Sequence, residues 1–146
     1  MKRQIKKFII PTIVIGLFII IYFFIYPIYK LDKATKTIFK DFENGLTNFK
    51  VEYKKEELDA SEYGAKKAYS YTANEKLLML YVFPKNSSKF NEGLKNGYIV
   101  SKKNDKSKLY GIFLNNCVLL IESEYPNNEQ VLSLFNSLSE EYNSNL

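Results

Sequence analysis

FIIPTIVIGLFIIIYFFIYPIY, residues 8–29, contains no charged side chain. As a helix this stretch would be about 33 Å long at roughly 1.5 Å per residue, which exceeds the ~30 Å of bilayer hydrocarbon. A helix buried in a soluble domain seldom needs so long a run that is apolar on every face. The stretch therefore predicts a transmembrane helix, and the residues expected to anchor it in lipid include Phe8, Ile15, Leu17, Phe24 and Tyr29.

The residues after this stretch argue against removal by a signal peptidase. A cleaved signal has a shorter apolar region, followed by two small residues separated by one position. Here the chain continues YPIYKLDKATK, and Asp32 occupies a position that would require a small side chain. No cysteine near the end of the stretch offers a site for lipid attachment. We therefore expect an uncleaved signal-anchor helix.

Basic residues flank the stretch on both sides. Four precede it and four follow closely, so a count of lysine and arginine does not orient the helix. Long domains cross the membrane largely regardless of charge, and the leading four are concentrated in seven residues. We therefore expect a single-pass membrane protein with a cytoplasmic tail (1–7), a transmembrane helix (8–29) and an extracytoplasmic domain (30–146). The preceding set is Lys2, Arg3, Lys6 and Lys7, and the following set is Lys30, Lys33, Lys36 and Lys40.

Charge also limits the partners. The chain carries a net +5, but all 16 acids and 17 of the 21 basic residues follow the stretch, which leaves the domain near +1. Such a surface does not predict a nucleic-acid partner, and the basic run at 102–108 is typical of an exposed turn. The large excess of lysine over arginine, with abundant Asn and Ile, is typical of AT-rich genomes, from which we infer a low-GC bacterium with a Gram-positive cell envelope as the source.

Chemical motifs are scarce. The chain has no histidine and one cysteine, Cys117, in the apolar run CVLLI, so we expect a buried structural thiol and no internal disulfide. Zinc-site and phosphate-loop patterns are absent, and Ser87, Ser88 and Lys89 are better explained as a helix start than as a catalytic dyad. No catalytic, cofactor or metal residues are predicted. The acids Glu56, Glu57, Asp59 and Glu62 fit a solvated loop, and the alternatives are a carboxylate pair for glycoside cleavage or oxygen ligands for a cation.

The domain is expected to have an α+β fold built on one mostly antiparallel sheet of about six strands flanked by helices. The order is helix, three strands, helix, three strands, helix. Apolar residues at helical spacing predict helices at 31–44, 86–97 and 128–142, the first ending at Asn44-Gly45. Alternating or continuous apolar runs predict strands at 49–53, 68–73, 77–83, 98–101, 109–114 and 117–122.

Tyrosine is unusually frequent, at 12 residues with no tryptophan. Tyr69 and Tyr71 are two positions apart and project to the same face of one strand. Packing in the core is the ordinary explanation, and an exposed docking face for a protein or glycan is the alternative.

Two classes of function remain. The first is a non-enzymatic binding or accessory module, held at the membrane to bind another membrane or envelope protein. The second is a hydrolase or transferase that acts on cell-wall polymer through Glu or Asp residues, with a small-ligand-binding domain as a further alternative. Two carboxylates facing each other across a cleft would favour the second class.

Overall fold

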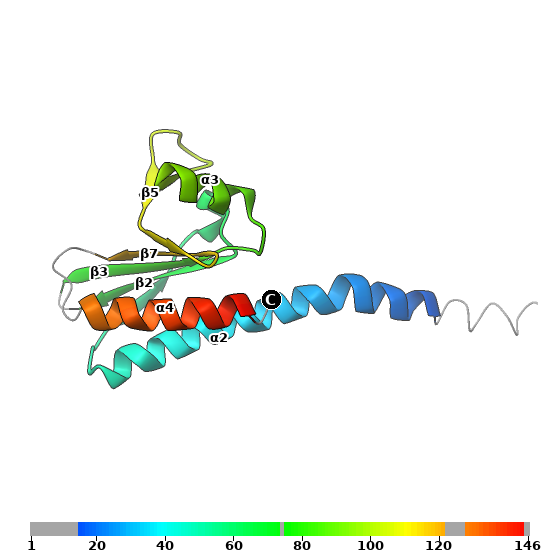
Figure 1. The fold of residues 1–146 in the computed structure, drawn as a ribbon, viewed down its shortest axis with the longest axis horizontal. Helices are drawn as coiled ribbons and strands as arrows, with labels where there is room; N and C mark the ends of the chain where they lie inside the picture. The colour runs from blue at the N-terminus through cyan, green and yellow to red at the C-terminus, as the bar shows by residue number, and fades with distance from the viewer. Residues whose placement is uncertain (1–14, 74, 122–127, 145–146) are drawn as a thin grey trace, which may run out of the picture. The chain divides into compact units, whose positions relative to one another are not determined.

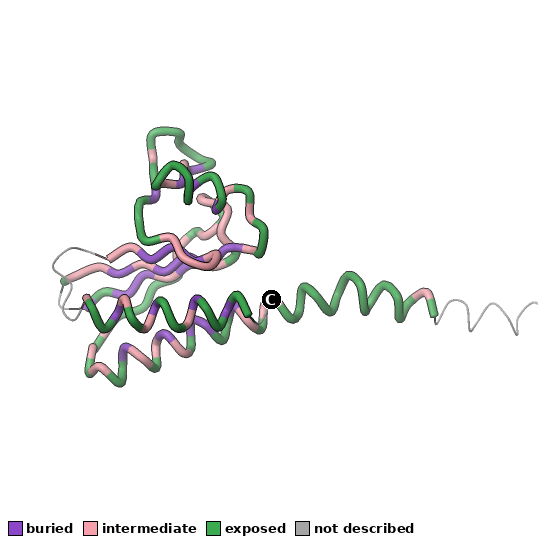
Figure 2. The backbone as a smooth tube through the Cα atoms, in the orientation of Figure 1, coloured by how far each residue is buried: buried purple, intermediate pink, exposed green. Residues whose placement is uncertain are grey.

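A computed structural model describes residues 15–73, 75–121 and 128–144. These residues form two compact units, one ending at Lys33 and the other beginning at Ala34. The ribbon in Figure 1 is coloured along the chain, and Figure 2 shows which parts of each unit are buried.

The first unit is helical. One helix runs from Ile15 to Asn48, and within the described residues it is the one helix long and apolar enough to cross a membrane. It contains a π-helical segment, η1 (Ile21–Ile25), followed by α2 (Tyr26–Asn48). The Tyr26 N–H donates to the Ile21 carbonyl, five residues back, just before Pro27, which has no N–H to donate.

The side chains of this apolar segment are exposed on all sides. Green colouring continues around the helix in Figure 2, and its most apolar window has no residue buried in the protein. The predicted anchor residues that fall in the described part, Ile15, Leu17, Phe24 and Tyr29, are each more than half exposed. Phe8 and the predicted topology residues Lys2, Arg3, Lys6 and Lys7 lie outside the described residues.

From Ala34 onward α2 belongs to the second unit and has a buried stripe, as the apolar spacing predicted. The helix does not end at Asn44-Gly45 but continues to Asn48, so the predicted boundary is wrong. Gly45 lies against the Leu134 side chain, and its missing Cβ permits close packing instead of a turn. The buried stripe consists of Thr35, Ile38, Phe39, Phe42 and Leu46.

The strand predicted at 49–53 is also wrong. Phe49 and Val51 donate their N–H groups to the Gly45 and Leu46 carbonyls and close the end of α2, and Lys50 has a φ of +59°. The alternating pattern was real, but the helix end uses the backbone donors that a strand would need. The first strand is instead β1 (Lys54–Glu57), in the segment expected to be a loop.

The main sheet has five strands in the order β1-β2-β3-β7-β6, all paired antiparallel. The predicted hairpin at 68–83 is confirmed as β2 (Lys67–Ala73) and β3 (Lys76–Val82). The second predicted hairpin is confirmed where β6 (Ile112–Leu114) meets β7 (Cys117–Ile121). Asn115 and Asn116 form its turn with φ values of +46° and +63°, which asparagine tolerates better than most residues.

The single strand predicted at 109–114 is two strands. Strand β5 (Lys108–Tyr110) pairs with β4 (Tyr98–Val100) in a separate two-stranded sheet, and the chain enters the main sheet only after Gly111. A Cβ on Gly111 would lie 2.8 Å from the Leu119 carbonyl oxygen, so glycine permits the close approach there. The described residues thus contain seven strands, and the predicted order of six is corrected.

Helices cover both faces of the main sheet in the second unit. The part of α2 after Ala34 lies on one face with α4 (Asn128–Ser144), while α3 (Ser88–Asn96) and the β4-β5 sheet lie over the other (Figure 1). The Ser87 side chain caps α3 by accepting from the Phe90 N–H at 3.2 Å, as predicted for a serine at a helix start. The α+β class and the mostly antiparallel sheet are therefore confirmed.

Candidate functional site: a lysine-lined hollow

A shallow hollow lies in the second unit where α2 crosses β1 and β2. Its volume is about 160 Å³. Four of its seven lining residues are lysines, two are aromatic and one is acidic. The lining residues are Lys36, Phe39, Lys40 and Glu43 from α2, Lys55 from β1, and Lys67 and Tyr69 from β2.

Helix and strand periodicity bring these residues together. On α2, positions 36, 40 and 43 are three or four residues apart and therefore share a face. On the sheet, Lys55 lies opposite Tyr71, and Glu57 lies opposite Tyr69. Side chains two residues apart on a strand point to the same face, so both pairs project toward α2.

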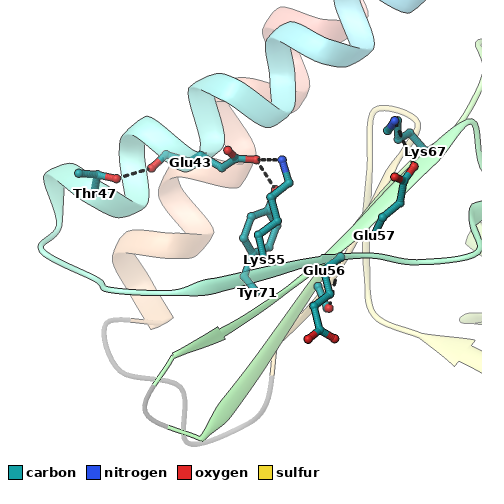
Figure 3. A network of polar contacts seen from close by, with 8 residues as sticks. Glu43, Thr47, Lys55, Glu56, Glu57, Lys67 and Tyr71 are labelled. Atoms are coloured by element: carbon teal, nitrogen blue, oxygen red, sulfur yellow. Dashed lines mark hydrogen bonds and ion pairs between the residues drawn. The ribbon is translucent and has the colours of Figure 1, made fainter.

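Glu43 is the polar centre of this region. Its Oε1 accepts a hydrogen bond from Lys55 Nζ at 2.5 Å and another from the Tyr71 hydroxyl at 3.1 Å (Figure 3). Tyr71 is fully buried, and burial followed by the nearby Glu43 charge raises the pKa of its phenol above the ordinary value. The carboxylate of Glu43 is thus bonded both to a cation and to a neutral hydroxyl, and it holds Lys55 in place.

Tyr69 forms the wall between the two strand lysines. Lys55 Nζ lies 3.9 Å and Lys67 Nζ 5.3 Å from the centroid of its ring, distances typical of cation–π contacts. The ring also packs edge-on against Phe39 at 4.8 Å between centroids. A hydrogen bond to Tyr69, and then one to Glu57, raise the pKa of Lys67, and Lys67 Nζ lies 3.1 Å from the Glu57 carboxylate.

The two helix lysines differ from the two strand lysines. Lys36 and Lys40 are exposed, and within the described residues neither forms an ion pair. Four lysines and one glutamate give the lining a net charge of +3. The hollow is therefore an electropositive surface with an aromatic wall.

The structure separates the two tyrosines of the predicted docking face. Tyr71 has no exposed surface, whereas Tyr69 is half-buried at the hollow. The two side chains do share one face, and Tyr69 is the one that keeps exposed surface, so a docking role there stays a prediction. The sequence did not single out the lysines, although the i, i+4 spacing of Lys36 and Lys40 was visible, because Lys55 and Lys67 join them only through the strand register.

The acids considered for catalysis each have a partner. Glu56 and Glu57 pair with Lys54 and Lys67. Asp59 accepts from Lys103 and Ser61, which lower the pKa of its carboxyl to about 2. Glu62 accepts from the Ser101 hydroxyl at 2.8 Å.

The structure also shows where Cys117 and the basic run at 102–108 lie. Cys117 is fully buried in β7, and burial raises the pKa of its thiol to about 12, so the thiol is unreactive at neutral pH. The basic run at 102–108 is an exposed turn leading into β5. Among the described residues, no group of three Cys, Asp or Glu side chains is arranged to hold a metal ion.

No protein-family model matches this chain, and neither the curated proteins nor the solved structures that were compared with it give a significant match.

Proposed function

We propose that this protein is a single-pass membrane protein that holds a small α+β domain at the extracytoplasmic face of the membrane. The domain acts there as a non-enzymatic binding or accessory module. The observation that carries the proposal is the helix from Ile15 to Asn48. Its first part is apolar and exposed on every face, while its later part supplies buried residues to a folded unit.

The exposed apolar side chains of this helix favour a lipid environment because water solvates them poorly. Ile, Leu, Phe and Tyr side chains between residues 15 and 29 leave a continuous apolar surface, far more than the single apolar patch that a soluble monomer tolerates in water. Hydrocarbon solvates such a helix at no cost, and its backbone groups are already hydrogen-bonded within the helix. Lysines on both sides of residues 8–29 would lie in the headgroup regions.

The bonding partners of the acidic side chains support a binding role over a catalytic one. The carboxylates between 56 and 62 form ion pairs and hydrogen bonds with their neighbours. The hollow described above contains a single carboxylate, Glu43, bonded to Lys55 and Tyr71. A glycosidase-type mechanism needs two carboxyl groups that both reach the substrate. A surface that binds a partner or ligand needs no such pair.

Cysteine labelling in intact cells tests the anchor and its orientation together. Cys117 is buried and its thiol has a raised pKa. A membrane-impermeant maleimide should therefore not label the unmodified chain, which serves as the negative control. Lys106→Cys places a thiol in an exposed turn of the domain, and Gln4→Cys places one in the basic tail. We expect labelling of Lys106→Cys but not of Gln4→Cys, with both proteins remaining in the membrane pellet after carbonate washing.

Two results would contradict the proposal in different ways. Recovery of the full-length chain in the carbonate supernatant would remove the anchor. Labelling of Gln4→Cys with protection of Lys106→Cys would keep the anchor and reverse the orientation.

A further inference from the structure

We propose that the lysine-lined hollow binds the phosphate group of an anionic phospholipid. The inference rests on the proposed membrane anchor for the source of the ligand, and on the geometry of the second unit for the chemistry. The proposed partner of the hollow is the lipid bilayer in which the chain is anchored.

Charge arrangement is the first argument. Lys55 is fixed by Glu43, Lys67 is fixed by Glu57, and both ammonium groups lie beside the Tyr69 ring. Holding a lysine in place before a ligand arrives removes part of the entropy cost of binding. The lining residues carry a net charge of +3, and Glu57, which pairs with Lys67 from outside the lining, lowers the local charge to +2. Phosphate oxygens are acceptors that lysine ammonium groups bind well.

The two helix lysines without ion pairs supply the second argument. Lys36 and Lys40 both line the hollow, and they are one helical turn apart on the same face of α2. Like charges at this spacing disfavour the helix. A bound anion in the hollow would reduce that repulsion.

The volume of the hollow and the chemistry of its lining restrict the class of ligand. The volume of about 160 Å³ corresponds to roughly five water molecules at about 30 Å³ each. This space suits one phosphate group and a short attached chain. Tyr69 places ring carbons beside the Lys55 and Lys67 ammonium groups, and the buried Phe39 ring packs edge-on against Tyr69. A glycerophosphate group has the matching combination, with charged oxygens on one side and C–H groups on the other.

Chain length favours a lipid source over a soluble one. Lys36 is seven residues after Tyr29, the last residue of the apolar stretch, so the chain cannot place it more than about 25 Å from that residue. The tether therefore keeps the domain close to the headgroups of the same bilayer, at a high effective concentration of lipid phosphate. Each lysine near an anionic membrane surface contributes measurably to binding.

The test uses the full chain in zwitterionic detergent micelles, with the backbone amide NMR shifts of residues 36–43 and 67–69 as the readout. Three probes are titrated separately: short-chain phosphatidylglycerol, short-chain phosphatidylcholine and inorganic phosphate. We expect saturable shifts with phosphatidylglycerol and little change with phosphatidylcholine. The double variant Lys36→Gln/Lys40→Gln should bind phosphatidylglycerol about thirtyfold more weakly.

A matched control has the same change in net charge elsewhere. Lys85→Gln/Lys106→Gln alters two exposed lysines that line no part of the hollow and should keep the affinity of the unmodified chain. Equal weakening in both double variants, or no preference for phosphatidylglycerol over phosphatidylcholine, would overturn the proposal. Saturation by inorganic phosphate with none by phosphatidylglycerol would overturn the lipid source.

This outcome is separate from the cell-labelling result, because binding in micelles does not depend on which side of the membrane the domain occupies. Loss of the anchor would show in the carbonate wash, whereas loss of the phosphate site would show only in the titration.

Discussion

Aromatic residues occupy opposite environments in the two units of this molecule. In the apolar segment Phe18, Tyr22 and Phe24 are about two-thirds exposed, at 68%, 67% and 66%. In the folded unit Phe42, Phe83 and Tyr71 are all at 0%. Composition alone cannot distinguish these environments, since both regions are rich in phenylalanine and tyrosine.

The distribution of polar residues distinguishes them. Between 15 and 29 apolar side chains surround the helix, and no polar face is left for water. After Ala34 the same helix buries one stripe, while lysines occupy its other side. A helix with one apolar stripe can bury that stripe against a sheet, whereas a helix that is apolar on every side needs an apolar solvent.

The largest effect we predict comes from making one substitution in both environments. Phe42→Ala removes a fully buried ring whose centroid lies 5.6 Å from that of Tyr71. This change should destabilise the domain by about 3–5 kcal/mol. Phe24→Ala should leave the stability of the domain unchanged, because that ring is exposed and is not part of the buried core. Urea unfolding of the full chain in micelles, followed by near-ultraviolet circular dichroism, measures both.

Phe42→Leu provides a milder variant if Phe42→Ala does not fold, and it should lose less stability because it leaves a smaller cavity. A loss of domain stability in Phe24→Ala as large as that in Phe42→Ala would show that the apolar segment belongs to the protein core, and the comparison would fail.

The sequence predicted those parts of the fold that depend on local patterns. The α+β class, the two hairpins, the Ser87 cap and the thiol buried in the core follow from periodicity, turn residues and apolar runs. The errors occurred where tertiary contacts decide the outcome. Residues 49–53 alternate like a strand, but the N–H groups of Phe49, Lys50 and Val51 bond to carbonyls at the end of α2. Gly111 divides one apolar run between two sheets because Leu119 of β7 approaches its backbone.

The candidate site was less predictable than the fold. Sequence spacing identified Tyr69 and Tyr71 as neighbours on one face, but it could not show that Tyr71 is buried against Phe42 while Tyr69 borders a hollow. The lysines come from three elements, and the pairing of β1 with β2 brings Lys55 and Lys67 beside α2. The error in the position of the first strand hid that arrangement, because Lys55 was expected in a loop.

A pair of glycines gives an intermediate effect and extends the comparison to the backbone. A Cβ on Gly45 would overlap the Leu134 side chain, with 2.7 Å to Cδ1 and 3.0 Å to Cγ. Alanine favours a helix over glycine by about 1 kcal/mol, but overpacking costs about 1–3 kcal/mol. Gly45→Ala should therefore destabilise the domain by roughly 1 kcal/mol net.

Gly16→Ala is the matched control, since a Cβ there meets nothing within 4 Å. The urea midpoint of the domain should be unaffected by Gly16→Ala and lowered by Gly45→Ala. A Gly45→Ala protein that is more stable than the unmodified chain would mean that Leu134 moves aside freely, so that α2 and α4 are not tightly packed at this point.

The smallest effect concerns pH, where the two units should again differ. Lys103 and Ser61 lower the pKa of Asp59 to about 2, whereas an unfolded aspartate titrates near 3.8. Between these values the unfolded chain binds more protons at this residue than the folded chain. The stabilising contribution is therefore present above about pH 4 and is lost as the pH falls toward 2. Because the pair is exposed, the contribution is small and screened by salt.

Asp59→Asn should therefore flatten the dependence of the urea midpoint on pH between 4 and 2 at low salt. Asp105→Asn, at an exposed acid that has no ion pair among the described residues, should not. Membrane retention should stay constant over the same range, since residues 8–29 contain no Asp, Glu, His, Lys or Arg. Midpoint curves that remain parallel for the unmodified and Asp59→Asn proteins would show that the Lys103 pair does not persist in solution. A membrane retention that falls with pH would mean that titrating groups of the domain help to hold the chain on the bilayer, and the two units would then not be energetically separate.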